Sequence, residues 1–195
     1  MKTAASPSLI ALPIATAEGE FIARYSAAGL AELDFPNAKA FVAPKRSEGG
    51  QPPSSTLHPP SSSAQSDRPS SVPLSAVPLS GWHRLTVAAL QNVLAGRAPK
   101  KLPPLDWFGT TEFQQSVWRA MLRLKPGQTR SYGEIARLIG RPRAVRAVGG
   151  ACGANPIPVL VPCHRVLAAG RRLGGFGGGL DWKRRLLARE GVVPA

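Results

Sequence analysis

The chain has 195 residues, with 25 Lys and Arg against 11 Asp and Glu, which gives a formal net charge of +14 at pH 7. This length allows one large domain or two small ones with a real hydrophobic core. Two cysteines are too few for a disulfide framework, and their spacing matches no metal motif, so we expect a reduced, intracellular (cytoplasmic) protein. The apolar stretch within residues 1–12 is too short for a membrane span and a poor secretion signal.

The positive charge is concentrated in the second half of the chain. From Arg97 onward there are 18 Lys and Arg against 5 Asp and Glu. Such a basic half favours a polyanionic partner, and nucleic acid fits better than a membrane surface. An ordinary solvated basic surface is the alternative that charge alone leaves open.

The first part of the chain predicts a small sheet, an insertion and a helix. Residues 20–25 and 29–35 alternate in polarity around a Ser-Ala-Ala-Gly turn, which indicates an antiparallel hairpin. Between residues 44 and 80, 19 of 37 residues are Ser or Pro and none is aromatic, so we expect a disordered insertion. An amphipathic helix follows over residues 82–94 and ends at Gly96; its apolar face comprises Leu85, Ala88, Ala89 and Val93.

The second part predicts four helices. Residues 111–114 and 131–134 both have capping-box spacing, which indicates helices over 112–124 and 132–138. A third helix is expected over about 143–150. The closing helix should span 181–189, with an apolar side formed by Trp182, Leu186 and Leu187.

The second and third of these helices form a helix-turn-helix pattern, whose second helix normally enters a DNA groove. Arg143 and Arg146 lie on one face of that helix, three residues apart. Its small residues would let the backbone approach DNA closely: Ala144, Ala147, Gly149, Gly150 and Ala151. An ordinary packed helical hairpin would show the same pattern.

A run at residues 161–166 sets the thiol of Cys163 beside the imidazole of His164 and the guanidinium of Arg165. A catalytic thiol needs a nearby base or positive field, because a free cysteine is mostly protonated at neutral pH. In an extended strand Cys163 and His164 would point to opposite faces, so contact requires a tight turn or a bridging water. The prolines between 155 and 162 make a turn plausible. The alternative is a structural cysteine beside a satisfied histidine.

The words Asn155-Pro156-Ile157-Pro158 and Pro162-Cys163-His164-Arg165-Val166 closely resemble the active-site signature of the O6-alkylguanine-DNA alkyltransferases, the methylated-DNA–protein-cysteine methyltransferases. The likeness extends over roughly residues 108–191, and residues 144–150 match the family's recognition helix. The resemblance implies an α+β fold: a ribonuclease-H-like sheet-plus-helix domain over 1–100, with the insertion at 44–80, and a winged helix-turn-helix-like domain over 101–195. No cysteine precedes Cys152, so we expect no structural zinc, and no cofactor.

The resemblance also implies a reaction and a set of roles. The protein would act as a monomer on double-stranded DNA and move an alkyl group from O6 of guanine to Cys163 in a single turnover. Whether O4-alkylthymine is also a substrate stays open. His164 would take the thiol proton through water, Glu190 would orient the imidazole, and Tyr132 would donate to the purine. Arg146 would replace the flipped nucleotide from the minor groove. Further DNA contacts would come from Ala144, Ala147, Arg143, Ser131 and Gly149.

The guanine pocket would be formed by Asn155, Val166, Phe176, Gly177 and Gly178, and Arg165 would anchor the structure. The glycine-rich loop over 174–180 lacks the Lys-Ser/Thr ending of a phosphate loop. Three other classes are less compatible with the residues. A lesion-binding relative would replace the nucleophile, a transcription regulator would carry a preceding cysteine cluster, and a thiol hydrolase would have no use for Arg146.

Overall fold

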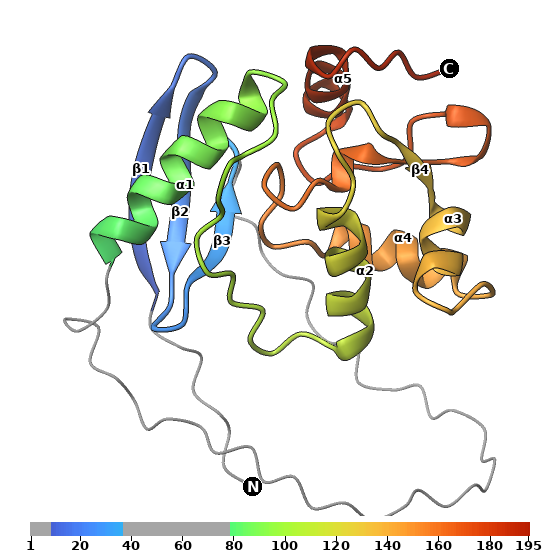
Figure 1. Cartoon of the computed structure of the whole chain (residues 1–195), viewed down its shortest axis with the longest axis horizontal. Helices are drawn as coiled ribbons and strands as arrows, with labels where there is room; N and C mark the ends of the chain where they lie inside the picture. Colours follow the sequence, from blue (N-terminus) through green and yellow to red (C-terminus); the bar gives the residue numbers. More distant parts are fainter. Residues whose placement is uncertain (1–8, 37–78) are drawn as a thin grey trace, which may run out of the picture.

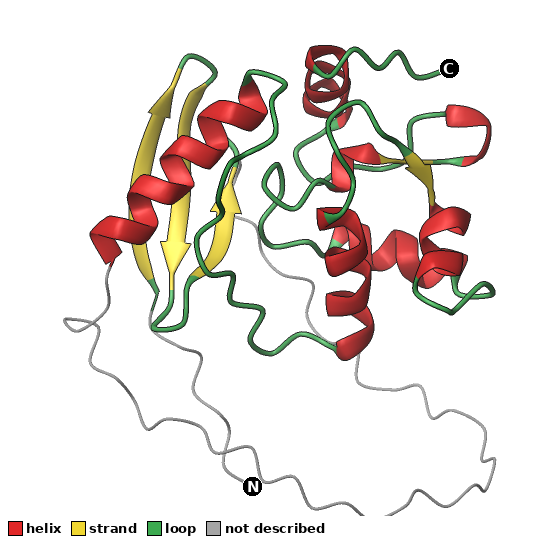
Figure 2. Cartoon of the chain, viewed as in Figure 1, coloured by secondary structure: helices red, strands yellow, loops and turns green. Residues whose placement is uncertain are grey.

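The computed structural model describes residues 9–36 and 79–195. A three-stranded sheet, with one helix lying along it, stands beside a second part that is mostly helical (Figure 1, Figure 2). The insertion predicted at 44–80 lies outside the described residues except for its last two. That boundary was wrong, because Leu79 and Ser80 already belong to the first helix.

The sheet contains β1 (Ile10–Thr16), β2 (Gly19–Tyr25) and β3 (Leu30–Asp34) in the order β1-β2-β3, and both pairs are antiparallel. The predicted hairpin is therefore confirmed as β2–β3. Strand β1 was not predicted separately, and it contains Pro13. An edge strand tolerates proline, because the missing N–H is not needed on its open side.

Helix α1 (Leu79–Leu94) begins three residues earlier than predicted. Its buried side consists of Thr86, Ala89, Leu90 and Val93. Ala88, which we expected on this side, is exposed. The buried hydroxyl of Thr86 donates to the carbonyl of Trp82 one turn earlier, so a polar side chain can occupy the apolar side.

The second part contains α2 (Glu112–Leu122), α3 (Tyr132–Leu138), α4 (Val145–Gly153) and α5 (Leu180–Arg189). Both capping boxes are confirmed, with Thr111 and Ser131 as the N-caps. Helix α4 starts two residues later than predicted, because the Ala144 N–H closes a turn onto Arg141 O (2.9 Å) before the helix begins. The helix also ends three residues later than predicted. The short strands β4 (Arg130–Ser131) and β5 (Val166–Leu167) pair in parallel.

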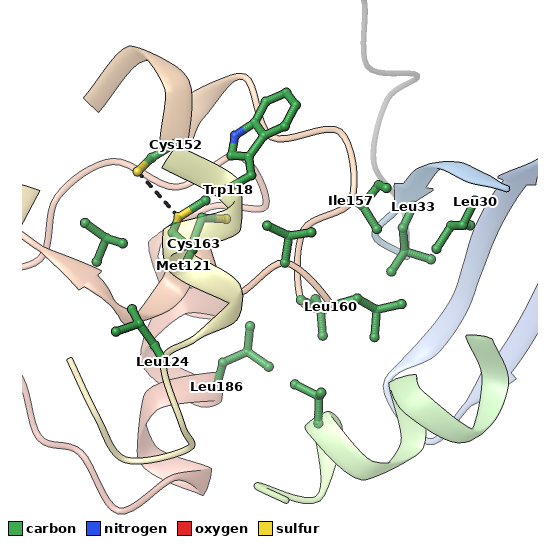
Figure 3. Close-up of a cluster of buried hydrophobic side chains, with 14 of the residues drawn as sticks. Leu30, Leu33, Trp118, Met121, Leu124, Cys152, Ile157, Leu160, Cys163 and Leu186 are labelled. Atoms are coloured by element: carbon green, nitrogen blue, oxygen red, sulfur yellow. Dashed lines mark hydrogen bonds between the residues drawn. The ribbon is translucent and has the colours of Figure 1, made fainter. Parts of the chain in front are cut away.

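One cluster of buried side chains joins the two parts of the molecule. It extends from Leu30 and Leu33 on β3, through Ile157 and Leu160, to Trp118 and Met121 on α2, with Cys163 inside it (Figure 3). The backbone of β3 is also used: Leu30 N donates to Pro104 O (2.8 Å) and Leu33 N to Pro156 O (2.9 Å). The sheet is thus hydrogen-bonded to the segment that precedes the cysteine.

Candidate active site

Cys163, His164 and Arg165 form a single 3₁₀ turn, and their exposed fractions are 5%, 0% and 4%. The expected tight turn is therefore present. It is prepared by a folded approach: Val161 N donates to Ile157 O and Cys163 N to Val161 O (2.9 and 2.8 Å). Val159 takes φ = 71°, a left-handed conformation that costs a β-branched residue energy. Strain of this kind is concentrated at functional sites.

Asn155 holds this turn against the end of α4. Its Nδ2 donates to Val161 O (2.8 Å) and to Cys163 Sγ (3.2 Å), while its Oδ1 accepts from Ile157 N (3.1 Å). The side chain is almost fully buried. Asn155 thus connects the helix-turn-helix to the thiol, and its amide N–H donates directly to the sulfur.

Glu190 is the centre of a buried charge network. Its carboxylate accepts from His164 Nε2 (3.0 Å), from Arg165 Nε and Nη2 (3.0 and 2.7 Å) and from Gly127 N (3.1 Å). Burial alone would raise the pKa of Glu190, but the hydrogen bonds from His164 and Arg165 outweigh it and lower the pKa to about 2. Arg165 also donates to Leu124 O (2.5 Å), which agrees with an anchoring role.

This network fixes the tautomer of His164. An ionised carboxylate only accepts hydrogen bonds, so the proton of neutral His164 resides on Nε2 and Nδ1 is an acceptor. Nδ1 is buried and has no hydrogen-bond partner among the described side chains and backbone. Burial lowers the pKa of His164 against the pull of Glu190. His164 is therefore a neutral base with a free acceptor nitrogen, in the same turn as the thiol.

Burial also raises the pKa of Cys163, against the opposing effects of the Asn155 hydrogen bond and the positive charge of Lys183. The pair therefore rests as a neutral thiol and a neutral imidazole. The second cysteine, Cys152, donates to Met121 Sδ (3.7 Å; Figure 3), and burial raises its pKa to about 12. Only Cys163 has both a hydrogen-bond donor on its sulfur and a base in its own turn.

Lys183 on α5 is part of the site, although we did not predict it. The side chain is fully buried, and Nζ donates to Val166 O (2.8 Å), Gly174 O (3.3 Å) and Gly175 O (3.4 Å). Lys183 thus joins the strand after the cysteine turn to the glycine-rich loop. A signal was present in the sequence: Lys183 lies on the apolar stripe of its helix, three residues before Leu186.

Tyr132, the first residue of α3, lies against the start of the loop. A Cβ added to Gly174 would come within 2.3 Å of the Tyr132 hydroxyl, so only glycine fits there. Burial raises the pKa of Tyr132, and the nearby Cys152 and Cys163 add to the shift. The phenol is therefore held neutral and can act as a hydrogen-bond donor.

The other residues expected in the pocket lie in β5 and in the glycine-rich loop. Val166 is buried in β5, and Gly177 is exposed in the loop. Phe176 is half-buried and packs edge-on against Phe35 of the N-terminal part, with ring centroids 5.6 Å apart. Gly178 lies directly against the same Phe35 ring. Phe35 was not predicted as part of the site.

The residues expected to contact DNA lie on and around α3 and α4. Arg143, Arg146 and Ala147 are exposed, while Ala144 and Gly149 are half-buried. The hydroxyl of Ser131 caps α3 and donates to Glu134 Oε2 (2.8 Å). Within residues 9–36 and 79–195, no group of His, Cys, Asp or Glu side chains could hold a metal ion, and no helix is long and apolar enough to cross a membrane.

Comparison with known proteins relates this geometry to a family. A family profile described as "6-O-methylguanine DNA methyltransferase, DNA binding domain" matches residues 112–192. A methylated-DNA–protein-cysteine methyltransferase of Mycobacterium tuberculosis is 52% identical over 104 residues, 53% of this chain and 62% of that protein. One of Mycobacterium leprae is 48% identical over 114 residues, 58% of this chain and 68% of that protein.

Solved structures extend the likeness to most of the chain. The O6-methylguanine methyltransferase of M. tuberculosis has a TM-score of 0.66 and 34% identity, covering 96% of each chain. The same organism's OGT in complex with DNA has a TM-score of 0.63 and 34% identity, covering 91% of this chain and 90% of that one. In sequence, the chain spans less than two thirds of the M. tuberculosis relative, whereas the structural likeness includes the N-terminal sheet. The chain belongs to the methylated-DNA–protein-cysteine methyltransferase family.

Proposed function

We propose that this protein repairs DNA by transferring an alkyl group from O6 of guanine to Sγ of Cys163, where it stays. The observation that carries the proposal is the buried series Asn155, Cys163, His164 and Glu190. In it a thiol that accepts an amide hydrogen bond shares one turn with a histidine whose tautomer is fixed by an ionised carboxylate. This is the nucleophile, base and orienting carboxylate that covalent catalysis requires.

The reaction balances within these residues. Nδ1 of His164 takes the thiol proton through a water, and Glu190 stabilises the imidazolium that results. The thiolate attacks the alkyl carbon, so an S–C bond forms while the C–O6 bond breaks and its electron pair goes to the guanine. In this proposal the phenol of Tyr132 donates a hydrogen bond to the purine ring as this charge develops. The guanine anion then takes up a proton from solvent, and the imidazolium of His164 gives its proton back to solvent. The products are therefore guanine in DNA, an S-alkylcysteine and neutral His164.

The same proposal assigns the DNA-binding surface to the helix-turn-helix. Helix α4 would lie in the minor groove, where the small residues Ala144, Ala147 and Gly149 permit close approach. Arg146 is exposed and would fill the space of the extruded nucleotide, while Arg143 and Ser131 would contact the neighbouring backbone. The extruded base would lie against Asn155, Val166, Phe176, Gly177 and Gly178.

The finer fold and cellular setting belong to this proposal as well. Residues 1–100 would form a ribonuclease-H-like domain, and residues 101–195 a winged helix-turn-helix in which β4 and β5 belong to the wing. The protein would act as a monomer in the reducing cytoplasm. That setting is consistent with Cys152 and Cys163, both of which are free thiols.

The test is to locate the alkyl group. The protein is incubated with a duplex that carries one O6-methylguanine, digested, and analysed by peptide mass spectrometry. A single added methyl on the Cys163 peptide, absent in Cys163→Ser, is the expected result. Tight binding of the duplex without any added mass would instead indicate a lesion-binding protein.

A further inference from the structure

The N-terminal sheet reaches the candidate guanine pocket through one aromatic side chain. Phe35 follows β3 directly, is 7% exposed, and packs against three rings, with centroid distances of 5.7 Å to Phe21, 4.9 Å to Trp182 and 5.6 Å to Phe176. Phe21 lies in the sheet, Trp182 in α5 and Phe176 in the glycine-rich loop. Phe35 is thus the ring through which sheet and loop touch.

Phe35 and Gly178 of the loop are in tight contact, with no room for a further atom between them. A Cβ placed on Gly178 would lie 2.5 Å from Phe35 Cε2, and 2.7 Å from both Cδ2 and Cζ. At Gly175, by contrast, an added Cβ would meet nothing within 4 Å. The loop backbone at Gly178 therefore rests against the Cδ2, Cε2 and Cζ atoms of the Phe35 ring, and its position depends on that ring.

The other end of the loop is held by different groups. Lys183 binds the carbonyls of Gly174 and Gly175, and Tyr132 packs against Gly174. Between these two supports the chain turns tightly, with Gly179 N donating to Phe176 O (3.0 Å). A loop held at both ends forms a rigid wall, whereas release of one end lets the turn swing toward or away from the thiol.

The backbone of β3 provides a second connection to the same site. Leu33 N donates to Pro156 O, and Asn155, the neighbour of Pro156, donates to the sulfur of Cys163. Leu33 on β3 thus holds the thiol side of the candidate pocket, and Phe35, two residues later, holds the loop side. Their relative placement sets the distance between nucleophile and wall.

We propose that Phe35 is a positioning residue that sets the width of the alkylguanine pocket and thereby determines which alkyl groups reach Cys163. This rests on the proposed alkyl transfer. With the Phe35 ring in place, the wall holds a purine with a small alkyl group in line with the sulfur. Without it, a small substrate loses alignment more than a large one, because a large alkyl group contributes apolar contacts of its own.

The experiment is a double-mutant cycle between Phe35→Leu and Gly178→Ala. Leucine lacks the Cε2 and Cζ atoms that obstruct a Cβ at position 178, so it relieves the overlap while retaining an apolar side chain. Second-order rate constants are measured with free O6-methylguanine and free O6-benzylguanine, well below the melting temperature of each variant. A parallel cycle with Gly175→Ala adds a methyl group to the same loop, away from the ring.

We expect Gly178→Ala alone to slow transfer from O6-methylguanine by about tenfold or more, because small displacements of a positioned group cost this much. In the Phe35→Leu background the same change should cost at least about fivefold less, whereas Gly175→Ala should cost the same in both backgrounds. Phe35→Leu should raise the benzyl-to-methyl rate ratio. Phe21→Leu, a matched loss of packing one ring away, should lower the melting temperature but leave the ratio unchanged.

Equal costs of Gly178→Ala in both backgrounds, or a rate ratio that moves equally in Phe21→Leu and Phe35→Leu, would overturn the inference while leaving alkyl transfer intact. A wild-type protein that reacts with neither base nor with the methylated duplex would overturn the proposed function itself, and this inference with it.

Discussion

Replacing Glu190 by glutamine separates the structural and chemical roles of the buried charge network. The carboxylate accepts hydrogen bonds from His164, Arg165 and Gly127. Glutamine has the same shape as glutamate but only one acceptor oxygen. Its NH2 group is itself a donor and would face the donors of these residues. Because Arg165 is 4% exposed, Glu190→Gln leaves a buried cation without its counter-ion, at a cost of ~3–5 kcal/mol. The imidazolium also loses its partner, so alkyl transfer should slow ~10²–10⁴-fold.

The pH dependence of stability gives this prediction a second readout. A carboxyl whose pKa falls from 4.5 to about 2 on folding contributes about 3 kcal/mol, which is fully present above pH 4.5 and lost as the pH falls toward 2. Glu190→Gln should therefore lack this loss between pH 4.5 and 2. Burial lowers the pKa of His164 and gives stability a second pH dependence, which begins as the pH falls below the ordinary histidine value of 6.5. There, stability falls as the pH drops, because the unfolded chain binds the proton more readily.

The assay combines urea unfolding at several pH values with the rate of methyl transfer from a methylated duplex. The double variant Arg165→Met/Glu190→Gln is the control, since it removes the stranded cation but not the chemical defect. It should recover much of the lost stability and none of the lost rate. The role given to this network would be refuted if Glu190→Gln transferred methyl groups at the wild-type rate. It would also be refuted if the variant lost as much stability between pH 4.5 and 2 as the wild-type protein does.

Three further outcomes follow from the site. Arg146→Ala should slow repair of a methylated duplex ~10-fold or more yet leave reaction with the free base unchanged, because only the duplex requires base extrusion, which costs a few kcal/mol; equal losses on both would contradict the flipping role. Asn155→Ala removes the hydrogen bond to Cys163 Sγ and should shift the pH–rate profile to higher pH, measured with free base. Gly174→Ala drives a methyl group into the Tyr132 hydroxyl and should lower the melting temperature and the rate together, whereas Gly175→Ala should leave the melting temperature unchanged.

The elements that the sequence predicted best are those determined by neighbouring residues. The capping boxes at Thr111 and Ser131 satisfy helix N–H groups within three residues, so they can be predicted from the sequence alone. The start of α1 was missed because Leu79 and Ser80 continue a Ser- and Pro-rich composition. The buried side of α1 was partly wrong because the packing partner, not the helix, decides whether Ala88 or Leu90 is covered.

In the site, too, the features that were not predicted depend on contacts between segments distant in sequence. Cys163, His164 and Glu190 were predicted through a family resemblance. In the structure His164 is hydrogen-bonded to Glu190, and Cys163 lies in the same turn as His164. The contacts of Lys183 and Phe35 depend on chain segments distant in sequence: Lys183 binds backbone carbonyls 8 to 17 residues away, and Phe35 touches a loop in the other half of the chain. Neither a lysine on an apolar stripe nor a phenylalanine after a strand specifies such partners by itself.

The stoichiometry of repair tests the central claim most directly. A thioether has no good leaving group, and the other thiol, Cys152, is buried with a pKa of about 12. Under excess methylated duplex, a burst of repair should equal the concentration of active protein and be followed by no steady-state rate. Continued turnover after the burst, or a methyl group on Cys152, would contradict direct and irreversible transfer to Cys163.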